Sequence, residues 1–181
     1  MKKTIILAFL AMSIVCTKAQ TSKIAAQQLN CTEISFWLKQ LETNFKGIPT
    51  KKLDETELTS IRKINGFDTC TIRHNEENTF RYADGFSIFK DLKGAKLYYE
   101  KAVKGTMTCL KSKQYTVHPS EAAENNNLFQ VATKTYGQKG GYWQVRIELK
   151  ERYDAEGQLS NGKNGYEVLI VLELRTIGVS G

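Results

Sequence analysis

The two histidines of the chain, His74 and His118, are the residues best suited to acid–base chemistry. A pair of histidines can act as general acid and general base in a ribonuclease, with a lysine that holds the phosphate. The two residues lie on different predicted strands, so the fold can bring them together. Each also has a structural explanation, His74 as a hydrogen-bonded strand residue and His118 as a turn residue before Pro119. A small secreted hydrolase, such as a nuclease that uses both histidines, is one of two hypotheses for this chain.

Other catalytic motifs are missing from the sequence. There is no Gly-X-Ser-X-Gly motif for a nucleophilic serine. The glycines of residues 137–141 are followed by a predicted strand and not by a helix, so they indicate a hairpin turn and not a phosphate-binding loop. No Cys-X-X-Cys pair or other metal-ligand spacing occurs. We therefore expect no metal and no cofactor, and the second hypothesis is a binding protein without catalytic activity.

A cluster of aromatic and cationic residues surrounds this glycine turn and favours the binding hypothesis. Aromatic rings beside cations suit sugar rings, single-stranded nucleic acid or a protein partner. The alternative is that Trp143 belongs to the core and that the tyrosines cover its edge. If the chain has a ligand surface, we expect it here and on the polar face of the following strand. The candidate binding residues are Tyr136, Lys139, Tyr142, Trp143 and Arg146.

The first 19 residues have the features of a secretory signal peptide. A basic start precedes an apolar run of about a dozen residues, and the small residues Thr17 and Ala19 stand before the expected cleavage. This run is shorter than the roughly 20 residues that a membrane span needs. An alternative is a lipid anchor on Cys16, but the residues before Cys16 match a lipobox poorly. The sequence thus predicts a periplasmic or secreted domain, residues 20–181, without a transmembrane segment after signal cleavage.

Three cysteines, Cys31, Cys70 and Cys109, belong to the predicted mature chain. In an oxidising compartment they allow one disulfide bridge and leave one thiol over. We favour a Cys70–Cys109 bridge, from a strand to the end of a helix, because both residues lie in the body of the predicted domain. The alternative is that all three are small buried residues without a bridge.

The charge balance weakens the case for a nucleic-acid partner. The whole chain has 26 lysine and arginine residues against 19 acidic ones, a formal net charge of +7. Cleavage after Ala19 removes Lys2, Lys3 and Lys18 and no acidic residue, which lowers the net charge to +4. An envelope or secreted protein or peptide is the partner that we expect instead. The remaining length suits one domain with a proper core.

The most regular pattern of the chain predicts a long hairpin near its C-terminal end. Apolar residues alternate with polar ones in Trp143-Gln-Val-Arg-Ile-Glu-Leu-Lys150. Such alternation is typical of a strand with one buried face, here Val145, Ile147 and Leu149, and one wet face. Residues 166–175 are apolar on both faces in the middle, which predicts a more interior strand. The apolar face of this hairpin must be covered by other elements.

Two amphipathic helices are predicted to supply that cover. The first spans residues 25–44 and has Trp37 on its apolar face, and the second begins at the cap residue Asp91 and ends near residue 110. Between them, Asn65-Gly66 predicts a tight hairpin, because both turn positions favour positive φ.

The order of these elements predicts the fold class. A helix, two or three strands, a second helix and four strands follow one another, which indicates an α+β domain. We expect a two-layer sandwich in which an antiparallel sheet is covered by two helices. The strand at residues 128–136 is expected to turn Phe129 and Val131 inward, and residues 79–89 form one bent strand or a small hairpin.

Three stretches of the chain resemble a pattern in uncharacterised small exported bacterial α+β proteins. They are Asn44-Phe-Lys-Gly-Ile-Pro-Thr-Lys-Lys-Leu53, Gly66-Phe-Asp-Thr-Cys70 and the helix that closes on Cys109-Leu110. The element order is similar to that of type III secretion chaperones. The resemblance covers most of the mature chain at the level of element order and includes no catalytic motif. It implies a scaffold that binds a protein or peptide.

Overall fold

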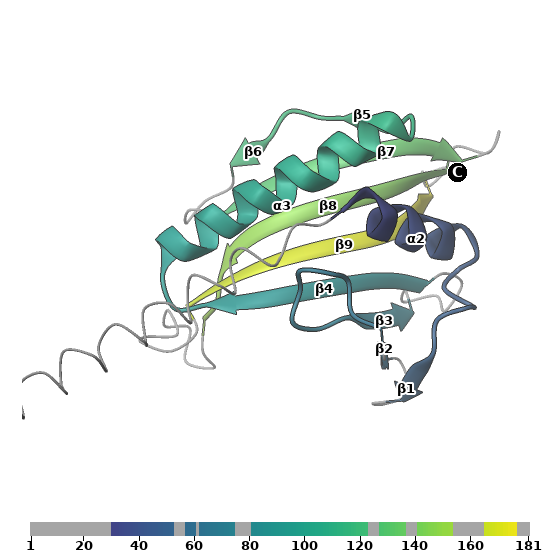
Figure 1. Cartoon of the computed structure of the whole chain (residues 1–181), viewed down its shortest axis with the longest axis horizontal. Helices are drawn as coiled ribbons and strands as arrows, with labels where there is room; N and C mark the ends of the chain where they lie inside the picture. Colours follow the sequence, from purple (N-terminus) through teal and green to yellow (C-terminus); the bar gives the residue numbers. More distant parts are fainter. Residues whose placement is uncertain are drawn as a thin grey trace, which may run out of the picture.

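A computed structural model describes residues 30–52, 57–60, 62–74, 81–122, 127–136, 141–153 and 165–176. Within these residues, two helices lie on one antiparallel sheet (Figure 1). The helices are α2 (Cys31–Glu42) and α3 (Leu92–Ser112). The strands are β1 (Thr50–Lys52), β2 (Glu57–Ser60), β3 (Thr71–His74), β4 (Arg81–Phe89), β5 (Thr116–Val117), β6 (Glu121–Ala122), β7 (Leu128–Tyr136), β8 (Gly141–Glu151) and β9 (Tyr166–Thr176). The predicted two-layer α+β class, with its helix–strands–helix–strands order, is confirmed.

The described strands form one sheet in the order β1-β2-β3-β4-β9-β8-β7-β5, and β6 also pairs with β7. β8 and β9 form the long hairpin that the sequence predicted, with Gly141 opposite Thr176 at one end and Glu151 opposite Tyr166 at the other. β9 pairs with β4 on its other side, so it lies inside the sheet as expected. The short strands β1 and β5 stand at the two ends of this order, which limits the backbone groups left for another chain.

The face of the sheet under the helices, which we call the covered face, holds the core. Its central side chains are at most 1% exposed: Val145, Ile147 and Leu149 on β8, and Val168, Ile170 and Leu172 on β9. Complete burial of one branched aliphatic side chain contributes about 1.5–3 kcal/mol. The prediction that the apolar face of the hairpin is covered is therefore confirmed, and these two strands form the centre of the core.

Helix α2 begins at a well-defined cap. The Asn30 side chain accepts a hydrogen bond of 2.8 Å from the Glu33 backbone N–H, which satisfies one of the free donors of the first turn. The predicted start near residue 25 is therefore wrong, because Asn30 has an extended conformation and the helix begins at Cys31. Its buried side chains include Trp37, which is 0% exposed and donates from Nε1 to Glu33 Oε1 at 2.8 Å.

Helix α3 follows the prediction closely. The Asp91 side chain accepts a hydrogen bond of 2.8 Å from the Gly94 N–H, and the helix runs two residues past the expected end. Its buried positions recur every three or four residues, the spacing that places them on one side of a helix. They are Ala95, Tyr98, Tyr99, Ala102, Thr106, Met107, Cys109 and Leu110.

The connection between β2 and β3 differs from the tight hairpin that Asn65-Gly66 predicted. β2 and β3 pair antiparallel, but residues 62–70 form a longer loop that contains this turn, with Gly66 at a φ of 96°. Ile64 and Phe67 beside the turn are 0% and 4% exposed, and the Phe67 ring meets the Tyr98 ring edge-on at 5.8 Å. The tight hairpin fails because both apolar side chains gain more by entering the core under α3 than by extending the ladder.

This loop lies directly on the sheet, and Gly85 of β4 makes the approach possible. A Cβ atom at position 85 would stand 3.0 Å from the Thr69 carbonyl oxygen and 3.3 Å from both Ile64 Cδ1 and Phe67 Cβ. The backbone N–H groups of Asp68 and Thr69 donate to the Phe86 carbonyl. The loop therefore acts as a third piece of cover beside the two helices, which the sequence analysis did not anticipate.

Strand β7 turns the opposite residues inward from those predicted. Its register places Val131 opposite Arg146 and Ala132 opposite Val145, so Ala132 faces the core and Val131 the other side. The expectation that Phe129 and Val131 point inward is wrong, because the long pairing with β8 fixes the register and outweighs side-chain size. Residues 81–89 form the single strand β4, and residues 121–122 pair with β7 as β6.

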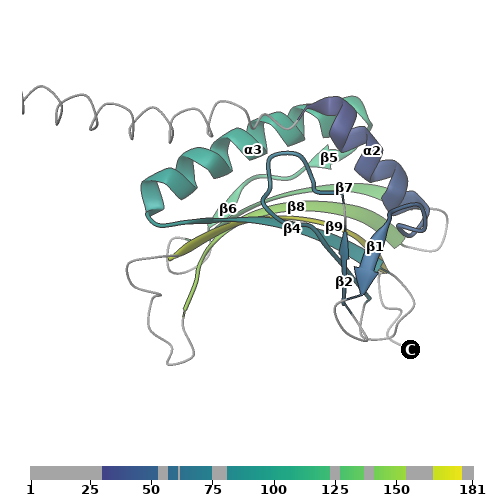
Figure 2. The same cartoon turned by 60° about the horizontal axis from the view of Figure 1, so that its bottom comes forward.

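The sheet is bent beneath the helices. Figure 2 shows α3 and α2 on the outer side of the bend and the opposite face of β4, β9, β8 and β7 on its inner side. The second face of the sheet is thus a shallow concave surface.

Candidate functional site

The concave face of the sheet, which we call the open face, has no described helix or loop lying over it. It is formed by the alternate residues of the four central strands, whose other residues point into the core. These are Tyr82, Asp84, Phe86 and Ile88 on β4, Glu167, Leu169, Val171, Glu173 and Arg175 on β9, Tyr142, Gln144, Arg146, Glu148 and Lys150 on β8, and Phe129, Val131, Thr133 and Thr135 on β7.

Paired charges run along β8 and β9 in the middle of the open face. Arg146 contacts Glu148 on its own strand, and its Nη1 lies 3.7 Å from Glu173 Oε1 on β9. Arg175 Nη2 lies 3.0 Å from the same carboxylate oxygen. The side chains of Arg146, Glu148 and Glu173 are only 15–26% exposed. Water therefore screens these attractions less than it would on an open surface.

Two further groups of ion pairs border this network. Glu167 lies between Lys150 Nζ at 3.4 Å and Arg152 Nε at 3.5 Å. On the opposite side of the face, Arg73 Nη1 lies 3.0 Å from Asp84 Oδ2. Acidic and basic groups alternate, so the open face has no large field of one sign. Such a surface does not match the polyanionic backbone of a nucleic acid.

Apolar side chains flank the charged pair Arg146–Glu148 of β8 on both sides. Leu169 and Val171 of β9 lie opposite this pair on one side, with Phe86 of β4 beside Leu169. Phe129 and Val131 of β7 lie on the other side, opposite Glu148 and Arg146. Leu169 and Val171 are 7% and 5% exposed, and the three others are half-buried. The solvated face of an antiparallel sheet is normally polar, so these apolar side chains require an explanation.

The predicted binding residues do not form one cluster. Tyr142 and Arg146 lie on the open face, but Trp143 points to the covered face and packs half-buried against the core. The pleat separates these neighbours, because successive side chains of a strand point to opposite faces. The backbone of Tyr136 pairs with Gly141, and Lys139 lies outside the described residues. Two of the five candidate binding residues, Tyr142 and Arg146, thus lie on the open face.

The two histidines are far apart in the sheet. His74 ends β3 and His118 directly follows β5, and β4, β9, β8 and β7 lie between these strands. Five strand spacings of about 4.8 Å give a separation of roughly 24 Å. His118 Nε2 forms a 2.8 Å hydrogen bond with Thr133 Oγ1. The hypothesis that both histidines act together in one nuclease site is therefore wrong.

Comparisons with protein-family models, with curated proteins and with solved structures give no match to this chain. Function must therefore be argued from its own residues. In the described part of the chain, no three His, Cys, Asp or Glu side chains gather into a potential metal site. None of the helices described there is long and apolar enough to cross a membrane.

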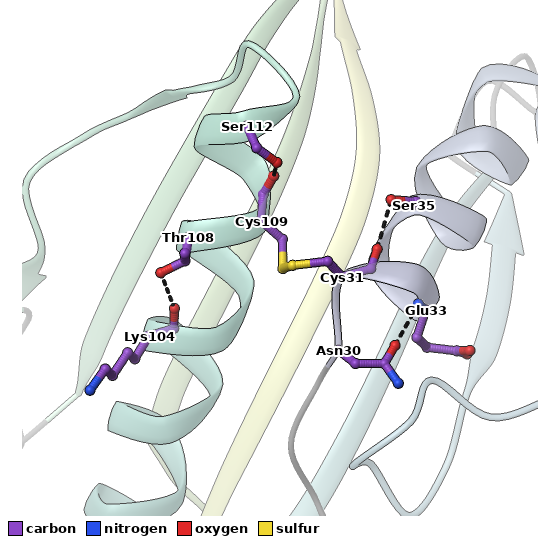
Figure 3. Close-up of a disulfide and its surroundings, with 8 residues drawn as sticks. All are labelled: Asn30, Cys31, Glu33, Ser35, Lys104, Thr108, Cys109 and Ser112. Atoms are coloured by element: carbon purple, nitrogen blue, oxygen red, sulfur yellow. Dashed lines mark hydrogen bonds between the residues drawn. A yellow bond between two sulfur atoms is a disulfide. The ribbon is translucent and has the colours of Figure 1, made fainter.

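The disulfide joins Cys31 to Cys109, and the predicted Cys70–Cys109 bridge is wrong. Figure 3 shows the bridge between the first residue of α2 and the last turns of α3, with a Cα–Cα distance of 5.2 Å. Cys70 is instead a buried free thiol at the end of the 62–70 loop. The pairing follows from the way α2 starts beside the end of α3, which no local pattern reveals. The prediction of one bridge and one remaining thiol is confirmed for these three cysteines.

The described groups with raised pKa values lie under the helices and not on the open face. Burial, and secondarily the charge of Asp84, raises the pKa of the Cys70 thiol to about 12. Burial also raises the pKa values of Tyr98 and Tyr99, and the hydrogen bond between the Tyr99 and Ser120 hydroxyls opposes part of the rise at Tyr99. A thiol with such a pKa stays protonated and inert near neutral pH. These groups stabilise the core and offer no nucleophile to a substrate.

Proposed function

We propose that this protein is an exported, non-catalytic binding protein that holds a protein partner on the open face of its sheet. One observation supports the proposal above all. Apolar side chains of β4, β9 and β7 flank the charged pair of β8 on a concave surface over which no described helix or loop lies.

The dimensions of this surface suit a helical segment of a partner. β4 and β7 are three strand spacings apart, which is roughly 14 Å. An α-helix with its side chains is about 10–12 Å wide. An amphipathic helix laid along β8 would cover Val171 and Val131 with its apolar residues. Its polar residues would meet Arg146 and Glu148, which already neutralise each other and so need no new countercharge.

The binding role agrees with what the element order implied. The resemblance to type III secretion chaperones stays a prediction, and it also favours a scaffold that binds protein or peptide. The nuclease hypothesis requires His74 and His118 in one site, and the strand order keeps them apart. We therefore do not propose a catalytic function.

Export is supported by two independent features. The basic and apolar start of the chain has the pattern of a signal peptide, and the Cys31–Cys109 bridge is the kind of bond that persists in an oxidising compartment. The mass of the mature protein tests this part. We expect a chain that begins at Gln20, whereas a lipid-modified chain that begins at Cys16 would show membrane anchoring instead.

Site-specific photo-crosslinking in the producing cells tests the binding surface. A photoreactive phenylalanine analogue replaces Phe129 on the open face, and in a control protein it replaces the exposed Lys101 on α3. We expect a discrete adduct from position 129 and none from position 101. The captured protein is then purified, and the variant Phe129→Asp should bind it at least about tenfold more weakly. Adducts from both positions, or from neither, would contradict the proposal.

A further inference from the structure

Lys134 of β7 lies on the covered face of the sheet, where a charged side chain is unexpected. The alternate residues Gln130 and Ala132 face the covered side, and Lys134 continues this series. Lys134 is half-buried, with its Nζ 5.9 Å from the centre of the Tyr115 ring. A cation on the core side of a strand is costly unless it reaches solvent or a polar partner.

Lys134 reaches a pocket at the junction of the two helices. This pocket, which we call the lysine pocket, has a volume of about 240 Å³. One wall is a single face of α2, another is the turn after α3, and β7 supplies the third. The lining residues are Ser35, Leu38, Lys39, Glu42, Lys113, Tyr115 and Lys134.

The lysine pocket has a positive charge that the described residues leave largely uncompensated. Three ammonium groups, those of Lys39, Lys113 and Lys134, line it together with one carboxylate, that of Glu42. Within the described ranges no salt bridge within 4 Å joins any of these four groups to another residue. The formal charge of the pocket is therefore +2.

The other walls of the pocket suit an organic body attached to an anion. Leu38 and the ring of Tyr115 are 6% and 7% exposed and give it apolar sides. The backbone carbonyls of Leu110 and Lys111, at the end of α3, already accept hydrogen bonds from the backbone N–H groups of Lys113 and Gln114.

We propose that the lysine pocket binds a small phosphate monoester. A phosphate monoester carries a charge of about −1.5 to −2 at pH 7, which matches the charge of the pocket. Lysine binds phosphate as a point charge, so the three ammonium groups of the pocket can hold a phosphate group without an arginine. The pocket lies on the helix side of the sheet, so it is independent of the open face and its proposed partner.

Titration of the mature protein with glucose 1-phosphate, followed by amide NMR and calorimetry, tests this proposal. We expect saturable binding with shifts at Lys113, Tyr115 and Lys134, and no shifts with glucose. Loss of one charge-assisted contact in Lys134→Gln should weaken binding about tenfold. The control Lys101→Gln removes an equal charge from the outer side of α3 and should leave the affinity unchanged.

A second variant and a second source of phosphate complete the test. Lys113→Gln changes an exposed residue and should also weaken binding about tenfold, even if Lys134→Gln fails to fold. Vesicles containing phosphatidic acid, compared with phosphatidylcholine alone, show whether the phosphate group can belong to a lipid. Either source supports the proposal when binding depends on Lys113. No saturable binding to either source, or equal losses in Lys101→Gln, would overturn it.

Discussion

The two faces of strand β9 differ in what covers them, although both are apolar in the middle of the strand. Val168, Ile170 and Leu172 lie under α2 and α3 and are at most 1% exposed. Leu169 and Val171 point to the open face and are shielded without any described helix or loop above them. The fold accounts fully for the first set. The second set is what distinguishes this sheet from one with an ordinary solvated face, and it is the basis for our proposal of a binding surface.

Removal of the disulfide, which joins the two helices on the covered face, should give the largest loss of stability. The bridge joins residues 78 positions apart, and closing a loop of that length stabilises a protein by about 4 kcal/mol. We expect Cys31→Ser to lower the free energy of unfolding by roughly that amount in denaturant titrations. Reductant should then have no further effect on the variant. A matched Cys70→Ser variant should keep its sensitivity to reductant, and loss of that sensitivity would show that another pair is bridged.

Two valines on neighbouring strands compare the faces directly. Val145 is 0% exposed on the covered face, and half-buried Val131 lies on the open face. Val145→Ala should cost about 2 kcal/mol, because it removes buried methyl groups and leaves a cavity. Val131→Ala should cost less than about 1 kcal/mol. Equal losses in urea titrations would mean that the open face is packed as fully as the core.

Gly85→Ala tests whether the loop belongs to the covering layer. The added methyl group would stand 3.0 Å from the Thr69 carbonyl oxygen, so the loop must move away from the sheet. We expect a loss of about 1–3 kcal/mol, as for other overpacked sites. Amide shifts should concentrate on residues 62–70. A neutral substitution would show that this loop does not rest on β4.

Alkaline pH should lower the stability of the folded protein through the buried thiol of Cys70. Its folded pKa of about 12 lies above the ordinary thiol value of 9.0, so the folded state holds the proton more tightly. The protonated thiol contributes its full stabilisation of the folded state below pH 9. This contribution is lost as the pH rises from 9 to 12, and the loss amounts to about 1 kcal/mol at pH 10. Cys70→Ala should lose correspondingly less stability than the unaltered protein between pH 8 and pH 10. Parallel losses in both proteins would exclude this role of the thiol.

The sequence was most informative where one local pattern determines the structure. The alternation around Val145 and the cap at Asp91 predicted β8 and the start of α3 correctly. It was least informative where the outcome depends on contacts between distant segments. The inward residues of β7 follow from its register with β8, and the partner of Cys109 follows from the placement of α2.

The candidate sites were predictable only in part for the same reason. Tyr142, Trp143 and Arg146 were grouped in one candidate site, but only Tyr142 and Arg146 lie on the open face, and the period-two pattern contained the signal that separates Trp143 from them. The lysine pocket combines residues of three elements, and only the position of Lys134 in the inward series of β7 could have indicated it.

Solvent paramagnetic relaxation of valine methyl groups tests the central contrast between the two faces most directly. In the mature protein, a soluble gadolinium chelate should broaden the Val131 methyl signals strongly and leave those of Val145 and Val168 sharp. Protection of Val131 equal to that of Val145 would mean that the chain already covers its open face, and would contradict the account.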